Sequence, residues 1–222
     1  MPVIPETAAA TRQKTVHSDR DGNVEHLLDR LYDSRDMQER FSAMREIEKI
    51  GQPAVKSIVQ RINQGGPWYF IRNMTLLLGR IGDENQLEAL EPLVCHPDSR
   101  VQLEAVKSIQ AINGQNAGPV LLKKIEEVDP ELVGYIISVL GALRCREAGP
   151  YLVELLESKQ PGLSRRVRDD IRAKACEALG RLGAQEAVPV LEKIVREKGF
   201  IKGYPEHIRS AASKALVNIS RR

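Results

Sequence analysis

The stretch IRAKACEALGRLG, residues 171–183, decides the fold. Apolar or small residues recur in it at the positions of Ile171, Ala175, Ala178 and Leu179. Because an α-helix turns once every 3.6 residues, positions i, i+4, i+7 and i+8 lie on one face, which is expected to be buried. The stretch therefore predicts an amphipathic helix whose small residues allow neighbouring helices to approach closely.

Similar stretches recur along the whole chain. The residues at the second position of the pattern are Ala43, Met74, Ala105, Ile136, Ala175 and Ala212. Their successive spacings are 31, 31, 31, 39 and 37 residues. A period of about 20–50 residues indicates an array of stacked units, each of which buries its apolar face against its neighbours. No window alternates apolar and polar residues for long enough to form a strand, so the predicted fold class is all-α.

Each unit is expected to be a pair of helices, and six pairs would form an α-solenoid that curves as a right-handed superhelix. The expected pairs are 24–33 with 37–50, 52–63 with 67–81, 85–95 with 99–112, 117–127 with 130–143, 147–157 with 165–182, and 185–197 with 206–219. The array is predicted to cover residues 23–222, with units at about 24–51, 52–82, 83–114, 115–145, 146–183 and 184–220. Residues 1–22 lack periodic apolar residues and are expected to be a flexible amino-terminal tail.

The composition is that of an ordered, water-soluble protein. The chain has 222 residues, of which 42% are hydrophobic and 28% are charged. No apolar run is long enough to span a membrane, and the first residues do not resemble a secretory signal. Cys95, Cys145 and Cys176 are odd in number and widely spaced, which excludes a disulfide framework and a Cys-x-x-Cys metal knuckle. A reducing, cytoplasmic location is therefore expected.

The segments DSRVQ, residues 98–102, and IRAKACEALG, residues 171–180, resemble the HEAT repeat. Together with Trp68-Tyr69, they are more narrowly similar to the short bacterial HEAT-like type, often called bilin-lyase-like. The resemblance covers residues 24–220 and implies that the second helix of each pair lines a concave surface. It does not imply a reaction, because one fold supports many functions.

The chain departs from the repeat pattern at two positions. The usual arginine is present as Arg40, Arg172 and Arg209 but is replaced by Ile71, Gln102 and Val133 in the second, third and fourth units. The glycine that follows leucine is replaced by Glu48, Gln110 and Val217 in the first, third and sixth units. The middle of the array is therefore expected to have a less charged face than its ends.

The predicted function is that of a non-enzymatic protein–protein interaction scaffold, or a regulatory or adaptor subunit. A partner protein is expected to bind along the concave face, with no cofactor, metal or catalytic residue in this chain. The candidate partner-binding residues lie on the second helices and are Tyr69, Arg72, Gln102, Tyr135, Lys174 and Lys214. Tyrosine and arginine are enriched at binding hot spots, which favours Tyr69, Arg72 and Tyr135.

Nucleic-acid binding is the first alternative, because residues 158–222 hold 15 basic and 7 acidic residues. The basic stripe consists of Arg165, Arg166, Arg168 and Arg172. Three of these arginines are three and four residues apart and would share a helix face that could meet phosphates or an acidic protein patch. The competing interpretation is a solvated helix face, balanced by neighbouring aspartates.

The densest aromatic spot, Trp68-Tyr69, is followed by Arg72. HEAT-like DNA glycosylases use aromatic and acidic residues on a basic concave face, but no acidic residue lies between Pro67 and Ile81. The favoured interpretation is packing between repeats, with a cation–π contact to Arg72.

A lyase- or hydroxylase-like HEAT enzyme is the second alternative. The hydroxylase branch of the HEAT-like families uses His-Glu pairs, whereas this chain has Glu25-His26 and Glu206-His207 in its first and last units. Pairs so far apart cannot bind one metal ion through bonds of about 2 Å. Cys145 is the better candidate nucleophile among the thiols, because arginines flank it on both sides.

Overall fold

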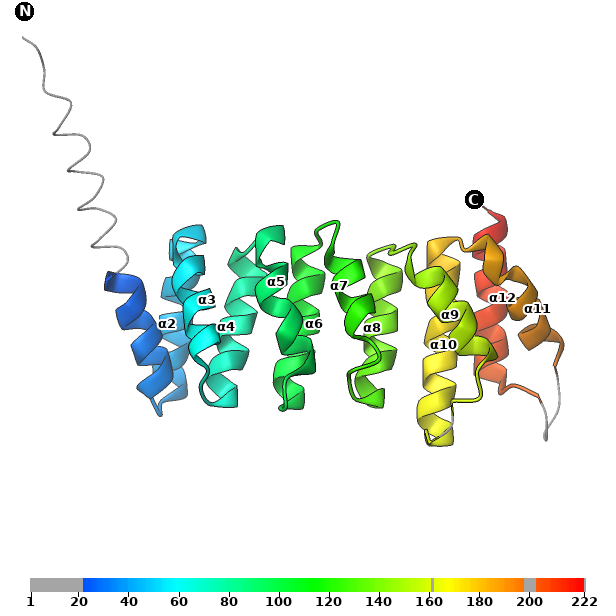
Figure 1. Ribbon diagram of the computed structural model, residues 1–222, viewed down its shortest axis with the longest axis horizontal. Coiled ribbons are helices and arrows are strands. Elements are labelled where there is room, and N and C mark those ends of the chain that lie inside the picture. Colours follow the sequence, from blue (N-terminus) through cyan, green and yellow to red (C-terminus); the bar gives the residue numbers. More distant parts are fainter. Residues whose placement is uncertain (1–21, 161, 198–202, 222) are drawn as a thin grey trace, which may run out of the picture. The chain divides into compact units, whose positions relative to one another are not determined.

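The computed structural model describes residues 22–160, 162–197 and 203–221, and every regular element in these ranges is helical (Figure 1). The predicted all-α solenoid is therefore confirmed. The expected tail at residues 1–22 lies outside the described residues, apart from residue 22, which is helical.

The second helices of the expected pairs carry the repeated pattern. They are α2 (Met37–Ile50), α4 (Trp68–Ile81), α6 (Ser99–Ile112), α8 (Pro130–Ala142), α10 (Arg165–Leu182) and α12 (Glu206–Ser220). The pattern residues Ala43, Met74, Ala105, Ile136, Ala175 and Ala212 are all 0% exposed. The sequence period thus identified the buried face of every second helix.

The first helices are shorter. They comprise residues 22–33 and the helices α3 (Val55–Gln64), α5 (Leu87–Leu90), α7 (Ala117–Lys124), α9 (Ala148–Glu157) and α11 (Val188–Arg196). Short 3-10 turns, Gln52–Ala54 and Gln185–Ala187, lead into α3 and α11. A proline lies in the opening turn of α11, where its missing N–H has no helical partner.

The helix expected at 85–95 is interrupted. The chain forms a 3-10 turn at Glu84–Gln86, then α5, then a second 3-10 turn at Glu91–Cys95. Pro92 has no N–H to continue the i to i−4 hydrogen bonding of α5, which explains why the α-helix stops there. The chain divides here into two compact units. Among the described residues, unit 1 contains 22–90 and 96–112, and unit 2 contains 91–95 and 113–221.

In unit 1, α4 and α6 pack closely against one another. Gly79 of α4 permits the approach, because a Cβ at this position would lie 2.7 Å from the Cα of Ser108. The Ser108 hydroxyl donates a hydrogen bond to the carbonyl oxygen of Thr75 at 2.9 Å, which satisfies a polar group inside the contact. The largest fully buried side chains of unit 1 include Leu27, Leu28, Leu31, Ile47, Ile58, Phe70, Met74, Leu77 and Leu78.

In unit 2, close contacts at a glycine likewise join α8 to α10 and α10 to α12. A Cβ on Gly141 would lie 2.9 Å from the Cα of Ala178, and a Cβ on Gly180 would lie 2.7 Å from the Cα of Ala215. Real Cβ atoms are not found this close to a neighbouring backbone, so these positions accept only glycine without movement of a helix.

We expect Gly180→Ala to lower the free energy of unfolding by about 1–3 kcal/mol, the usual cost of overpacking a close contact. Helix propensity alone would act in the opposite direction, by about 1 kcal/mol in favour of alanine. Thermal denaturation followed by circular dichroism measures the difference, with Ser213→Ala on the exposed side of α12 as the control. A stabilised Gly180→Ala protein would contradict the close contact between α10 and α12.

Candidate functional site

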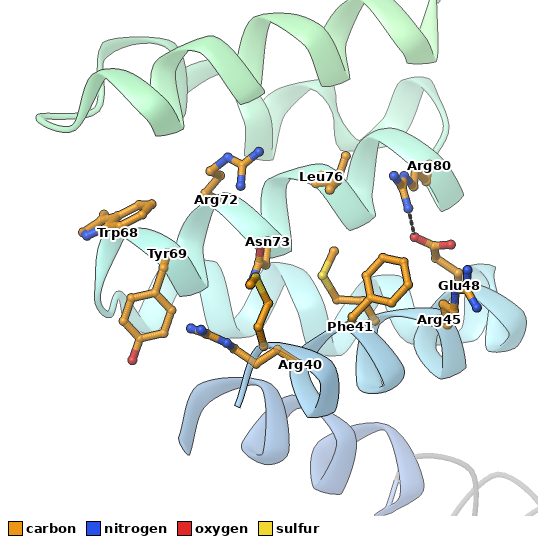
Figure 2. Close-up of a pocket in the computed structure, with 12 residues that line it drawn as sticks. Arg40, Phe41, Arg45, Glu48, Trp68, Tyr69, Arg72, Asn73, Leu76 and Arg80 are labelled. Atoms are coloured by element: carbon orange, nitrogen blue, oxygen red, sulfur yellow. Dashed lines mark hydrogen bonds and ion pairs between the residues drawn. The ribbon is translucent and has the colours of Figure 1, made fainter. Parts of the chain in front are cut away.

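A groove lies between α2 and α4 of unit 1, with a volume of about 580 Å³ (Figure 2). We call it the α2–α4 groove. It is lined from α2 by Met37, Arg40, Phe41, Met44, Arg45 and Glu48, and from α4 by Trp68, Tyr69, Arg72, Asn73, Leu76 and Arg80.

The groove lies next to the one position of α2 where the repeat pattern fails. Glu48 occupies the place that Gly79 holds in α4, 31 residues further along. At Gly79 the next helix is too near to admit even a methyl group. A glutamate side chain therefore prevents the same close approach of α2 to α4. The Glu48 carboxylate instead accepts a hydrogen bond from the Arg80 guanidinium across the groove (Figure 2).

Large apolar side chains of the groove are open to solvent. Met37 is 76% exposed, Phe41 is 54% exposed and Trp68 is 37% exposed. In Figure 2, Trp68 and Tyr69 lie at one end of the groove and Phe41 lies toward the other end. Clustered exposed apolar groups with a polar rim are typical of interaction sites, whereas single exposed ones need no explanation.

Three arginines of unit 1 stack on aromatic rings at or beside the groove. The distances from guanidinium carbon to ring centroid are 5.3 Å for Arg40 over Tyr69, 4.6 Å for Arg45 over Phe41 and 3.3 Å for Arg100 over Trp68. Such cation–π contacts hold the guanidinium groups in place. Arg100 also donates to the Asp98 carboxylate from Nε at 2.9 Å and from Nη2 at 2.6 Å.

Arg72 has a different partner from the one expected. Its Nη2 atom lies 3.0 Å from Oε2 of Glu104 on α6, and the Glu104 side chain is only 7% exposed. Arg72 was expected to form the cation–π contact at this aromatic pair. Arg100 stacks on Trp68 instead. Arg72 therefore neutralises a nearly buried carboxylate and also lines the groove.

The structure brings two of the predicted partner-binding residues, Tyr69 and Arg72, together in the α2–α4 groove. Gln102 offers little surface to a partner, since it is 8% exposed and its amide donates a hydrogen bond to the carbonyl oxygen of His96 at 2.8 Å. The Gln102 side chain therefore binds the loop that precedes α6.

The other predicted partner-binding residues belong to unit 2. Tyr135 on α8 is half-buried, and Lys214 on α12 is exposed. The ammonium group of Lys174 donates to the Asp170 carboxylate at 2.8 Å, and this pair lies over Gly134 of α8, where a Cβ would meet both side chains. None of these three residues lines the α2–α4 groove.

The basic stripe of α10 is partly neutralised within unit 2. Arg165 lies 3.6 Å from the Asp169 carboxylate, and Arg166 lies 3.8 Å from that of Glu131. Arg172 donates to the carbonyl oxygen of Ser158 at 3.0 Å and stacks 5.6 Å from the ring centroid of Tyr204. Arg168 is partly buried. The stripe therefore carries less uncompensated charge than its sequence indicates.

The buried cysteines are poorly suited to nucleophilic catalysis. Burial raises the pKa of the Cys145 thiol to about 11, and a hydrogen bond from its Sγ to the Glu147 carboxylate at 3.4 Å acts in the same direction. Burial raises the pKa of Cys176 to about 12. The arginines that flank Cys145 in sequence do not offset its burial. In the part of the chain that the structure describes, no group of three histidine, cysteine, aspartate or glutamate side chains could hold a metal ion.

Sequence reasoning missed the α2 side of the groove, namely Met37, Arg40, Phe41 and Arg45. Two signals could have indicated it. Met37, Phe41 and Arg45 are four residues apart and place large side chains on one face of α2. Glu48, noted as a departure from the glycine pattern, indicates that α2 cannot pack as the glycine-bearing second helices α4, α8 and α10 do.

The described elements define an all-α solenoid, and the comparisons identify the repeat. Residues 118–201 match the family model of HEAT repeats. The resemblance to the HEAT family is therefore confirmed over this part of the chain. No curated protein matches the chain significantly. No helix of the described residues is both long and apolar enough to cross a membrane.

Several solved structures are similar to the chain. An engineered protein is 19% identical, with 89% of this chain and 96% of that chain covered and a TM-score of 0.48. Human deoxyhypusine hydroxylase in complex with glycerol is 14% identical, with 95% and 99% covered and a TM-score of 0.44. A chain of the complex of CpcE and CpcF of phycocyanin lyase from Nostoc sp. PCC7120 is 17% identical, with 89% and 91% covered and a TM-score of 0.43. Identities this low are compatible with many activities on one fold.

We expect Arg72→Met to destabilise unit 1 by about 1–3 kcal/mol, because it leaves the nearly buried Glu104 carboxylate without its charged partner. The double variant Arg72→Met with Glu104→Gln should recover much of this loss. Urea denaturation of the wild type, both single variants and the double variant measures the coupling. Additive effects of the two substitutions would show that the ion pair has no structural role.

We expect alkylation of Cys145 by iodoacetamide to be slow at pH 8 and to accelerate about tenfold per pH unit between pH 7 and 9, because only the thiolate reacts. In denaturant the thiol regains an ordinary pKa and should react at least about 100-fold faster. Peptide mass spectrometry of timed samples gives the rate at each cysteine. Rapid labelling with a plateau below pH 8 would instead identify an activated thiol.

Proposed function

We propose that this protein is a non-enzymatic scaffold or adaptor subunit that binds a protein partner along the second helices of its HEAT repeats. The observation that carries this proposal is the α2–α4 groove, where Met37, Phe41 and Trp68 are exposed side by side with arginines. In the unbound protein these side chains expose apolar area to water, and a bound partner would bury that area.

The residue types of the groove support protein binding in particular. Tryptophan, tyrosine and arginine dominate binding hot spots, and all three line the groove. Methionine adds a flexible, polarisable surface that adapts to the shape of a bound side chain, and Met37 is 76% exposed in the groove.

The basic stripe supports nucleic-acid binding less well. Arg165 and Arg166 pair with carboxylates, and Arg172 is directed to the Ser158 carbonyl oxygen. Affinity for nucleic acid depends chiefly on cations that are free to meet phosphates. We therefore expect a protein to be the principal partner.

A pull-down from source lysate near physiological salt, with and without nuclease, tests the proposal. We expect a protein that is retained in both arms by the wild type and lost with Phe41→Asp, which places a charge among the apolar side chains of the groove. Val217→Asp is the matched control, because Val217 is 44% exposed and lies on α12, outside the groove.

Two outcomes would contradict the proposal. Retention that disappears with nuclease and requires Arg165 and Arg168 would establish the nucleic-acid alternative. Equal loss of the partner with Phe41→Asp and Val217→Asp would show that the groove has no special part in binding.

A further inference from the structure

We propose that the α2–α4 groove binds an amphipathic helix of a partner protein, with apolar side chains in the groove and carboxylates at its rim. This inference rests on the proposed scaffold function and specifies the chemistry of the bound segment.

The shape of the groove favours a helical ligand. Its walls are two helices of 14 residues each, α2 and α4. A helix of this length extends about 21 Å, or roughly four turns. Apolar side chains at positions i, i+3, i+4 and i+7 of a bound helix form a single row, which is the usual way a helix fills an apolar groove between two others. The cavity volume of about 580 Å³ accommodates such a row.

The apolar part of the groove supplies the contacts for that row. Phe41 and Met37 line the groove from α2 and are more than half exposed. Leu76 lines it from α4, across from Phe41 (Figure 2). Trp68 lies at one end of the groove (Figure 2). Burying these side chains against leucine-like groups would remove from water apolar area that the chain itself leaves open.

The charge of the groove selects an acidic ligand. Four arginines and a single glutamate line it. Arg72 is neutralised by Glu104, and Arg80 is neutralised by Glu48. No carboxylate of the described residues forms an ion pair with Arg40 or Arg45, the two arginines of α2. These two cations therefore remain to be matched by the carboxylates of a ligand.

Arg40 and Arg45 are also already positioned. Each guanidinium group stacks on an aromatic ring of the groove, at 5.3 Å from Tyr69 and 4.6 Å from Phe41 respectively. Stacking lowers the conformational entropy that the side chain would lose on binding, and the planar fork of N–H donors matches a carboxylate.

The same stacking disfavours a nucleic-acid base as the ligand. One face of Trp68, Tyr69 and Phe41 is covered by Arg100, Arg40 and Arg45 respectively. Binding of single-stranded nucleic acid relies on open ring faces on which successive bases stack. A row of aliphatic side chains, in contrast, fits between the rings and the methionines.

Trp68 makes the site directly observable, because it is the only tryptophan in the chain. The probe is a synthetic amphipathic helix of about 14 residues, with leucine along one face and glutamate on both flanks. We expect saturable binding by calorimetry, accompanied by a change in Trp68 fluorescence. A peptide with lysine in place of every glutamate should bind at least about tenfold more weakly.

Substitutions in the full-length protein locate the binding. Phe41→Ala and Arg45→Glu should each weaken binding of the acidic peptide by about tenfold or more. Arg35→Glu, an exposed arginine that precedes α2 and does not line the groove, is the matched control and should change the affinity less than about twofold. Glu48→Gln removes the single acid of the groove and releases Arg80, so it should tighten binding by about two- to threefold.

Other results would overturn the inference. These are an absence of saturable heat with the acidic peptide, equal binding of the lysine peptide, or equal effects of Arg45→Glu and Arg35→Glu. Binding of a single-stranded oligonucleotide in preference to the acidic peptide, with the same dependence on Phe41, would assign the groove to nucleic acid.

Failure of this inference and failure of the scaffold function give different results. A lysate protein retained through Phe41, combined with no binding of the acidic peptide, would leave the scaffold function in place and show that the ligand chemistry is wrong. Binding of the peptide in the groove, combined with no Phe41-dependent protein in the lysate, would support the ligand chemistry and contradict the scaffold function.

Discussion

Neighbouring second helices approach one another through glycine and other small residues, and the rest of the structure depends on that approach. Gly79, Gly141 and Gly180 each lie so near the next helix that an added Cβ would overlap its backbone or a small side chain. A repeat array buries apolar surface only between adjacent units, so its core is formed at these contacts. Close approach therefore determines how well each pair of second helices excludes water.

The α2–α4 groove forms where this constraint is relaxed. Glu48 replaces glycine, keeps α2 from closing on α4, and pairs with Arg80 across the opening. Phe41 and Met37 are exposed on the same helix. An open apolar surface thus lies beside a departure from the repeat, and the arginines of α2 determine the charge that such a surface would accept.

The two units differ in how they use their charged and reactive groups. In unit 2, carboxylates near the arginines and Lys174 of α10 satisfy much of the positive charge locally, and burial keeps the thiols of Cys145 and Cys176 protonated. In unit 1, Arg40 and Arg45 stack on aromatic rings beside exposed apolar groups. Unit 1 therefore combines apolar surface with arginines that no carboxylate of the described residues pairs, and the proposed docking site rests on this combination.

The sequence by itself determined the repeat period, the all-α class and the buried position of each second helix, because helical periodicity depends only on which residues avoid water. Only the tertiary structure decided how side chains distant in sequence meet. It paired Arg72 with Glu104 and buried Gln102 against the loop at His96. It also opened the groove beside Glu48, because the space between two helices depends on the side chains of both and cannot be read from either one alone.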